Sequence, residues 1–241
     1  MDVSEQRREG AAMISLVTFD VVGTTVDDGG MVSRALRTAV EETGAQVSAE
    51  DVEAWAGIER VSAIAALMSL GGVRPRPGVA RRQLAQFKEI LADAWSSEPP
   101  QEIGGAASVF AQLQERGIRV ALTTDLDEQA LTPLMESLGW WPARRHLIDT
   151  VVTADDVSSG CPAPYLIHRA MERTMVIDVH QVLAVGDAVV DLQAAGNAGA
   201  VSAGVLTGAG DGQTMEAVGA DFLLGSVAEV PSVVSADSAM G

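Results

Sequence analysis

Acidic residues follow two apolar, β-branched runs of the sequence. Asp20 ends the run LVTF, and Asp187 and Asp191 follow the run VLAV in the segment GDAVVD. Such runs are typical of buried parallel strands, whose carboxyl ends meet at one edge of a sheet. Three carboxylates brought together there repel one another unless a cation neutralises them. Oxygen ligands suit Mg²⁺, with water and a bound anion completing its shell, so the sequence predicts a magnesium site.

Each acid also has a purely structural interpretation. Asp20 can form a turn with Gly23, and Asp187 can cap the helix that follows its strand. Two acidic motifs in this order at two strand ends favour the metal site over these alternatives.

Strand and helix patterns alternate along the second part of the chain. This alternation predicts an α/β fold, with a Rossmann-like parallel sheet covered by helices on both faces. The predicted strands after Leu16–Asp20 are Ile118–Thr124, Leu147–Thr153, Val182–Val185, Ala200–Leu206 and 221–226. The predicted helices are Ala106–Arg116, Glu128–Leu138, Pro164–Met175 and Leu192–Ala198.

Helical patterns alone fill residues 30–97, directly after the first strand. The predicted helices are 31–44, 48–57, Ser62–Leu70 and Val79–Trp95, with Ser48 and Asp51 forming a capping box at the start of the second. Glu98-Pro99-Pro100 is the predicted return linker. The expected organisation is an α/β core of residues 13–29 and 98–230 with an inserted all-helical cap of residues 30–97. Residues 1–12 and 231–241 are expected to be a loose extension and a frayed tail.

The composition limits the class of partner. Of the 241 residues, 47% are hydrophobic and 20% charged, which suits a packed globular protein. The net charge of −17 opposes nucleic acid and anionic membranes as partners, and no apolar run has the length of a membrane span. Cys161 is the single cysteine, so no intrachain disulfide can form and a cytoplasmic location is expected.

The segment DVVGTTVD at residues 20–27 resembles the opening motif of the haloacid dehalogenase superfamily. GDAVVD at residues 186–191 is similar to the metal-binding motif of that superfamily, and the placement of the helical insertion matches its type-I cap. The GTTVD form of the first motif looks most like the phosphonatase-like branch, which contains the phosphonoacetaldehyde hydrolases. The resemblance covers nearly the whole chain and implies a haloacid dehalogenase-like fold.

The resemblance also implies roles for individual residues. Asp20 would be the catalytic nucleophile, and Thr124 would hydrogen-bond the transferring phosphoryl group. The metal would be held by Asp20, the backbone carbonyl of Val22, Asp187 and Asp191. The implied substrate-binding positions are Gly23, Thr24, Arg60, Asp125 and Cys161.

Three positions depart from the family pattern. Val22 stands where phosphatase relatives carry a general acid, a loss that favours the phosphonatase-like branch. Arg60 stands where phosphonatases carry a lysine that forms a Schiff base with the substrate, which a guanidinium does not form. Cys161 stands where relatives carry a Lys or Arg that bridges the nucleophile and the phosphate. The single lysine, Lys88, lies in the last helix of the insertion and is expected to be solvated.

These features predict a Mg²⁺-dependent hydrolase that uses an aspartate nucleophile on a small phosphorylated or phosphonate metabolite. The missing cation at Cys161 predicts a slow enzyme that Cys161→Arg accelerates, provided that no other arginine, such as Arg60, fills the gap. One alternative is a phosphoglycolate-type phosphatase. The other is a non-catalytic protein that binds a ligand on the same fold. A small anionic metabolite is the expected partner, and a monomer or homodimer is the expected assembly.

Overall fold

A parallel six-stranded sheet forms the centre of the protein in a computed structural model that describes residues 13–55, 58–141 and 145–234. The strand order is β5-β4-β1-β6-β7-β8, and every neighbouring pair is parallel. The strands are β1 Leu16–Asp20, β4 Arg119–Thr123, β5 Thr150–Val152, β6 Val182–Gly186, β7 Val201–Val205 and β8 Phe222–Leu224. The predicted α/β class is confirmed, and the strand that carries Asp20 lies between β4 and β6.

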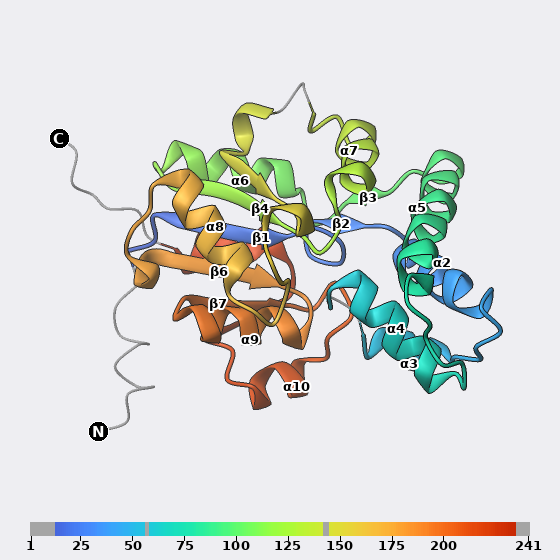
Figure 1. Ribbon diagram of the computed structural model, residues 1–241. Helices are drawn as coiled ribbons and strands as arrows, with labels where there is room; N and C mark the ends of the chain where they lie inside the picture. Colours follow the sequence, from blue (N-terminus) through green and yellow to red (C-terminus); the bar gives the residue numbers. More distant parts are fainter. Residues whose placement is uncertain (1–12, 56–57, 142–144, 235–241) are drawn as a thin grey trace.

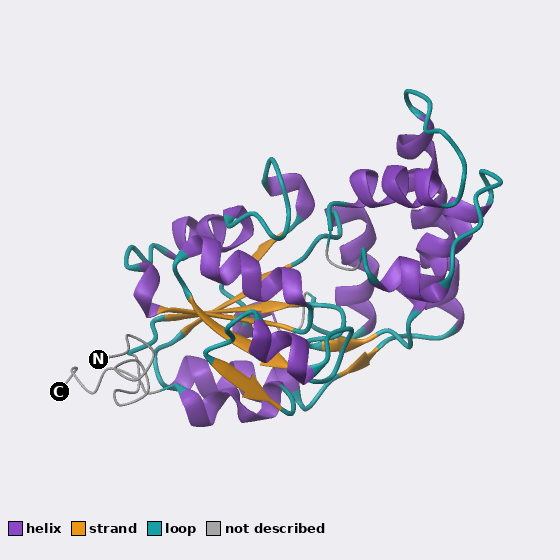
Figure 2. Ribbon diagram, turned by 90° about the horizontal axis from the view of Figure 1, so that it is seen from below, coloured by secondary structure: helices purple, strands orange, loops and turns teal. Residues whose placement is uncertain are grey.

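Helices cover both faces of this sheet (Figure 2). On one face α8 packs against β5, β4 and β1, and α9 packs against β6 and β7. On the other face α6 packs against β4, with α11 beside it. The helices of this part are α6 Ala106–Glu115, α7 Glu128–Ser137, α8 Tyr165–Thr174, α9 Val189–Ala198, α10 Gly212–Ala217 and α11 Val230–Val233.

Side chains of β1 alternate between the two faces because successive residues of a strand point in opposite directions. Val17 and Phe19 belong to the core on the α6 side, where the rings of Phe19 and Phe110 lie 5.2 Å apart between centroids. Leu16 belongs to the smaller core beneath α8 and α9. Burial on both faces explains why this strand reads as a continuous apolar run.

Four helices stand between β1 and the rest of the sheet in sequence. They are α2 Met31–Glu41, α3 Ala49–Glu53, α4 Arg60–Leu70 and α5 Val79–Ser97, and Figure 1 shows them beyond one end of the sheet. We call residues 30–97 the helical insertion. The chain leaves and returns through the antiparallel pair β2 Val26–Asp27 and β3 Gln101–Glu102, which the sequence did not predict. These strands have two residues each, too few for an alternating pattern.

The helix boundaries depart from the prediction where a local cap decides them. The predicted capping box of Ser48 and Asp51 is present at α3. Helix α4 begins at Arg60 rather than at Ser62, because the Glu59 carboxylate accepts hydrogen bonds from the Val61 and Ser62 amides. This earlier start makes Arg60 the first residue of the helix.

Two further expectations need correction. The strand predicted at 147–153 is limited to Thr150–Val152, since a 3₁₀ turn at Arg145–Leu147 precedes it. The tail expected from residue 231 is structured to Val234, because Val230 and Val234 are buried. Residues 1–12 and 235–241 lie outside the described residues.

Lys88 is not the solvated lysine that its sequence context predicts. Its ammonium forms an ion pair with Asp127, which also caps α7 by accepting a hydrogen bond from the Ala130 amide. The Lys88 side chain is 20% exposed, and it donates a second hydrogen bond of 3.3 Å to Gln129. The lysine therefore ties α5 of the insertion to the start of α7.

In the described chain, no helix combines the length and apolarity that crossing a membrane requires.

Candidate active site

The carboxyl end of β1 opens into a cavity of about 420 Å³ between the sheet and the helical insertion. We call it the Asp20 cavity. Among the expected site residues it is lined by Asp20, Val22, Gly23, Arg60, Asp125, Asp187 and Asp191. Leu36 of α2 and Val52 of α3 contribute to its wall. The tertiary structure thus brings together residues that are up to 171 positions apart in the chain, as 191 − 20 gives.

Asp187 is held from two sides. One of its carboxylate oxygens accepts a 2.8 Å hydrogen bond from the Thr24 hydroxyl, and the other accepts one of 2.8 Å from the Ala209 amide. Thr24 is fully buried, so its hydroxyl positions Asp187 instead of facing a substrate. Two glycines permit this close approach. A Cβ at Gly23 or Gly208 would lie only 2.5 Å or 1.9 Å from Asp187 Oδ2.

Asp191 is held at the first turn of α9. Its carboxylate accepts a 3.0 Å hydrogen bond from the amide of Ala188, the N-cap of that helix, so Asp191 and not Asp187 caps the helix. Cys161 lies close enough to Asp191 for the two groups to influence each other's pKa. Cys161 is not among the residues that line the Asp20 cavity. Burial, followed by the charges of Asp191 and Asp20, raises the pKa of the Cys161 thiol well above its ordinary value, so the thiol is neutral.

Burial raises the pKa of all three carboxyl groups. Burial, and then the charges of Asp191, Asp187 and Asp125, hold the pKa of Asp20 well above its ordinary value. Burial and the charge of Asp187 raise the pKa of Asp191 to about 7. For Asp187, burial outweighs hydrogen bonds that act in the opposite direction, and its pKa is raised as well. Each carboxylate makes the next one harder to ionise, which a bound cation would reverse.

The donor set fits Mg²⁺. In the part of the chain that the structure describes, no three His, Cys, Asp or Glu side chains are grouped closely enough to hold a metal by themselves. Mg²⁺ does not need such a group, since it is usually bound through one or two carboxylates and keeps several waters. The residues expected to hold the metal, Asp20, Val22, Asp187 and Asp191, all line the cavity.

Arg60 reaches the cavity from the helical insertion. Its guanidinium forms an ion pair with Asp125, the residue that follows Thr124 after β4. The Phe87 ring of α5 lies under the guanidinium, with 5.3 Å between its centroid and the Arg60 Cζ. This cation–π contact and the ion pair fix the arginine over the carboxyl edge of the sheet.

Thr124 does not take part in this cavity. It is buried, and its side-chain oxygen accepts a 3.1 Å hydrogen bond from the Leu126 amide, which stabilises the turn after β4. The neighbouring Thr123 donates a hydrogen bond of 3.3 Å to the Phe19 carbonyl. The structure therefore gives Thr124 the local hydrogen-bonding role that Ser and Thr often take in turns.

The loop after β7 belongs to the site but was missed. Thr207, Gly208 and Ala209 line the cavity, and the Thr207 hydroxyl donates a 2.7 Å hydrogen bond to the Gly23 carbonyl. The signal was available, because β7 was predicted and its carboxyl end must lie at the same edge as that of β6. Three acidic residues on the cavity wall were also missed, namely Asp27, Asp28 and Glu53.

Comparison with known proteins agrees with this geometry. The model of the haloacid dehalogenase-like hydrolase family matches residues 14–199, and the chain belongs to this family of hydrolases. A phosphonoacetaldehyde hydrolase of Parabacteroides distasonis is 25% identical over 257 aligned positions, covering 92% of this chain and 96% of the relative. One of Bacillus cereus is 28% identical and covers 85% of this chain and 81% of the relative. The expected likeness to the phosphonatase-like branch is confirmed.

Solved structures share the fold over nearly the whole chain. A hydrolase from Pseudomonas syringae superimposes with a TM-score of 0.80 at 21% identity, covering 92% of this chain and all of the other (100%). A phosphonoacetaldehyde hydrolase-like protein from Oleispira antarctica gives 0.76 at 20%, with 92% of each chain covered. A predicted phosphoglycolate phosphatase from Haemophilus somnus gives 0.76 at 17%, covering 93% and 99%. At these identities the likeness shows the fold alone.

Proposed function

We propose that the protein is a Mg²⁺-dependent hydrolase in which Asp20 attacks a small phosphorylated or phosphonate metabolite. The observation that carries this proposal is the position of Asp20. It ends the central strand β1 and lines one cavity with Asp187 and Asp191, at the sheet edge where open α/β folds bind ligands. Family membership and the curated relatives support a hydrolase of this kind.

Asp20 supplies the nucleophile in this proposal. One carboxylate oxygen forms a bond to phosphorus while the bond from phosphorus to the leaving group breaks, and the leaving group keeps the electron pair. A water molecule then cleaves the aspartyl phosphate, which restores the carboxylate and releases inorganic phosphate. One proton of that water balances the proton taken up by the leaving group. Bound Mg²⁺ supplies electrostatic stabilisation of the charge that develops on the phosphoryl oxygens.

Val22 sets the range of leaving groups. It lines the cavity next to Asp20, and its apolar side chain cannot give a proton to an alkoxide. General acid catalysis typically contributes about 10²- to 10⁴-fold in rate, so a low rate is expected on ordinary phosphate esters. A screen over phosphate esters, acyl phosphates and phosphonates, with Mg²⁺ and with Asp20→Asn as the control, tests the proposal. Turnover that survives in Asp20→Asn would rule out Asp20 as the nucleophile.

Phosphonoacetaldehyde hydrolysis through a Schiff base is not the activity that we propose. The chain has one lysine, and Lys88 is paired with Asp127, while the residue facing the cavity from α4 is Arg60. Treatment with phosphonoacetaldehyde and borohydride should leave the mass of the protein unchanged. A stable mass increase mapped to Lys88 would overturn this expectation and place the lysine in the catalytic step.

Two alternatives remain testable beside this proposal. A phosphoglycolate-type phosphatase is favoured by the fold shared with such a structure, and it predicts a clear preference for phosphoglycolate in the screen. A non-catalytic binder is favoured by Val22 and Cys161 at two functional positions. A binder without a metal site should show little Mg²⁺-dependent shift in thermal melting, because only ligands that bind the folded state raise its stability.

The remaining expectations extend this proposal. A small anionic metabolite is the proposed partner, and the net charge of −17 opposes nucleic acid. A bound cation can still attract an anionic substrate into an acidic protein. A cytoplasmic monomer or homodimer remains the proposed setting, and the proposed division is a core with a helical cap at 30–97.

A further inference from the structure

A single arginine provides the positive charge of the Asp20 cavity. Among the described residues that line it, Arg60 is the one basic side chain, and seven side chains are acidic. The acidic residues are Asp20, Asp27, Asp28, Glu53, Asp125, Asp187 and Asp191. Cys161, at the position where relatives carry a cation, is a free cysteine. Among the described lining residues, an anion that enters the cavity therefore meets one cation.

Arg60 is buried with hydrogen-bonding capacity left over. Its side chain is 7% exposed, and its Nη2 is paired with Asp125. Within the described structure, its Nε is a buried nitrogen without a hydrogen-bond partner. A guanidinium carries five N–H donors in one plane, and a buried donor without an acceptor is destabilising. The protein therefore leaves part of the buried guanidinium without an acceptor.

The position of the guanidinium is fixed before any ligand arrives. Phe87 lies against it, and the Glu59 carboxylate fixes the first turn of α4 through the Val61 and Ser62 amides. Asp125 holds Nη2 from the core side. A rigid donor fork loses little conformational entropy when it binds a tetrahedral anion, and Arg is well suited to bridging two anionic groups.

We propose that Arg60 binds the transferring phosphoryl group and takes the place of the cation absent at position 161. This inference rests on the proposed function and assigns its anion-binding residue. The cation then comes from the helical insertion instead of the core. The anion site is complete only while α4 lies against the loop after β4, so substrate binding and the packing of the insertion are coupled.

Calorimetric titration with inorganic phosphate in the presence of Mg²⁺ tests the proposal directly. Arg60→Met keeps a long apolar side chain beside Phe87 and removes the charge and the donors. Loss of a charge-assisted contact should weaken phosphate binding by roughly ten- to a hundredfold. Arg37→Met is the matched control, because Arg37 is an arginine of the same insertion that pairs with Glu41 at the surface. It should leave the phosphate dissociation constant unchanged.

A merely structural role for Arg60 gives a different result in a second variant. If Arg60 only neutralises Asp125, the double variant Arg60→Met/Asp125→Asn should bind phosphate as tightly as the wild type. If Arg60 contacts the anion, the double variant stays weak. Asp125→Asn alone should then bind phosphate at least as tightly as the wild type, because it removes a negative charge and frees Nη2.

Moving the charge back to the core provides a rescue. Cys161→Arg should restore phosphate binding in the Arg60→Met background and add little in the wild type. Comparing phosphate binding by Arg60→Met/Asp125→Asn with that of the wild type decides the proposal even if the Cys161→Arg variant does not fold. Wild-type affinity in Arg60→Met/Asp125→Asn, or no phosphate binding by the wild type at all, overturns the role of Arg60. Turnover that still depends on Mg²⁺ and Asp20 in that case leaves the proposed function intact.

Discussion

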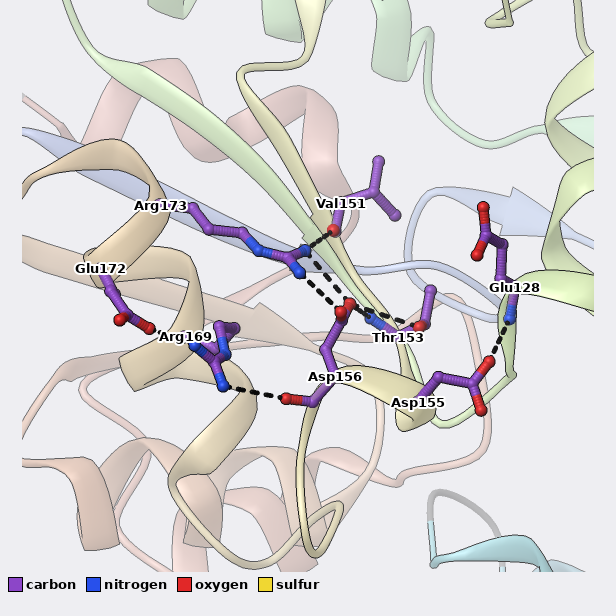
Figure 3. A network of polar contacts seen from close by, with 8 residues as sticks. All are labelled: Glu128, Val151, Thr153, Asp155, Asp156, Arg169, Glu172 and Arg173. Carbon is purple, nitrogen blue, oxygen red and sulfur yellow. Dashed lines mark hydrogen bonds and ion pairs between the residues drawn. The ribbon is translucent and has the colours of Figure 1, made fainter.

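Two groups of carboxylates lie beside the sheet, and they are neutralised differently. Next to the edge strand β5, Asp156 accepts hydrogen bonds of 2.5 Å and 3.1 Å from Arg173 and one of 3.0 Å from the Thr153 amide (Figure 3). Arg173 also donates a 2.6 Å hydrogen bond to the Val151 carbonyl of β5. In the Asp20 cavity, seven acidic side chains share one arginine. Asp156 thus has an arginine of its own, whereas the carboxylates of the Asp20 cavity outnumber their arginine.

The pKa values of the two groups move in opposite directions. Burial tends to raise the pKa of Asp156, but the bonds from Arg173 and Thr153 outweigh it and the net pKa is lowered. Burial and neighbouring charges raise the pKa of Asp20 well above its ordinary value. A carboxylate that only holds the fold together acquires its own partner. Carboxylates left to repel one another indicate a candidate functional site, because perturbed pKa values often mark such sites.

Neutralising one acid in each group should give the largest contrast. Asp20→Asn should lower turnover by at least about 10³-fold, because it removes the nucleophile itself. Mg²⁺ binding should become weaker but remain detectable. Asp187→Asn should lose both turnover and Mg²⁺ binding, whereas Asp156→Asn should retain both. Steady-state kinetics and calorimetry measure these effects. Equal losses of activity in Asp156→Asn and Asp20→Asn would erase the functional distinction between the groups.

The hydroxyl that positions Asp187 should matter for the metal. Thr24→Val keeps the shape of a fully buried side chain but removes the 2.8 Å hydrogen bond to Asp187. Outer-shell partners typically change metal affinity by about 10- to 100-fold, so the Mg²⁺ dissociation constant should rise by roughly tenfold or more. Thr153→Val is the control, because Thr153 lies beside Asp156 in the contacts of Figure 3, which we call the β5 network. It should leave Mg²⁺ affinity unchanged. A Thr24→Val protein with wild-type affinity would show that Asp187 needs no such support.

The metal-free protein should become less stable as the pH rises. A carboxyl group with a raised folded pKa contributes stability below its unfolded pKa of about 4, and this contribution is lost as the pH rises through the folded pKa. For Asp191 that window ends at about 7. Asp20→Asn should therefore melt higher than the wild type near pH 8 without metal, by roughly 2–4 °C per kcal/mol of repulsion removed. Added Mg²⁺ should reduce the difference in melting temperature between Asp20→Asn and the wild type.

That expectation is checked by calorimetric melting of both proteins in EDTA between pH 4 and 8. The melting temperatures of the two proteins should converge as the pH falls toward 4. A wild-type protein that is most stable at pH 8 without metal, with Asp20→Asn no more stable, would contradict the idea of unrelieved repulsion.

The smallest effect is expected at the β5 network. Arg173→Met should cost about 1 kcal/mol or less at neutral pH, because the ion pair with Asp156 is partly exposed. The pKa of Asp156 is lowered in the fold, so this stability is present above its unfolded value of about 4 and is lost as the pH falls through the folded value. Urea denaturation at pH 7 and pH 3 should show a larger effect of Arg173→Met on the free energy of unfolding at the higher pH. A larger destabilisation by Arg173→Met at pH 3 than at pH 7 would contradict the lowered pKa of Asp156.

The class of fold and the acids expected at the candidate site could be predicted from the sequence. Leu16–Asp20 and Val182–Gly186 read as strands because burial on both faces makes them continuously apolar. The carboxyl ends of neighbouring parallel strands meet at one edge of the sheet, so the sequence could predict that Asp20 and Asp187 lie close together. The capping box of Ser48 and Asp51 could be predicted because its hydrogen bonds span only three residues.

Only the tertiary structure decided which partners the side chains choose. Thr24 donates to Asp187 across 163 positions, and Arg60 meets Asp125 across 65. Lys88 was expected in solvent and instead pairs with Asp127. Local patterns report which face of a helix or strand is apolar, but not which element from elsewhere in the chain will cover it. The charge balance of the Asp20 cavity depends on those long-range contacts. Burial and the proximity of other charges, and not residue type alone, determine how far the pKa of each carboxyl group is raised.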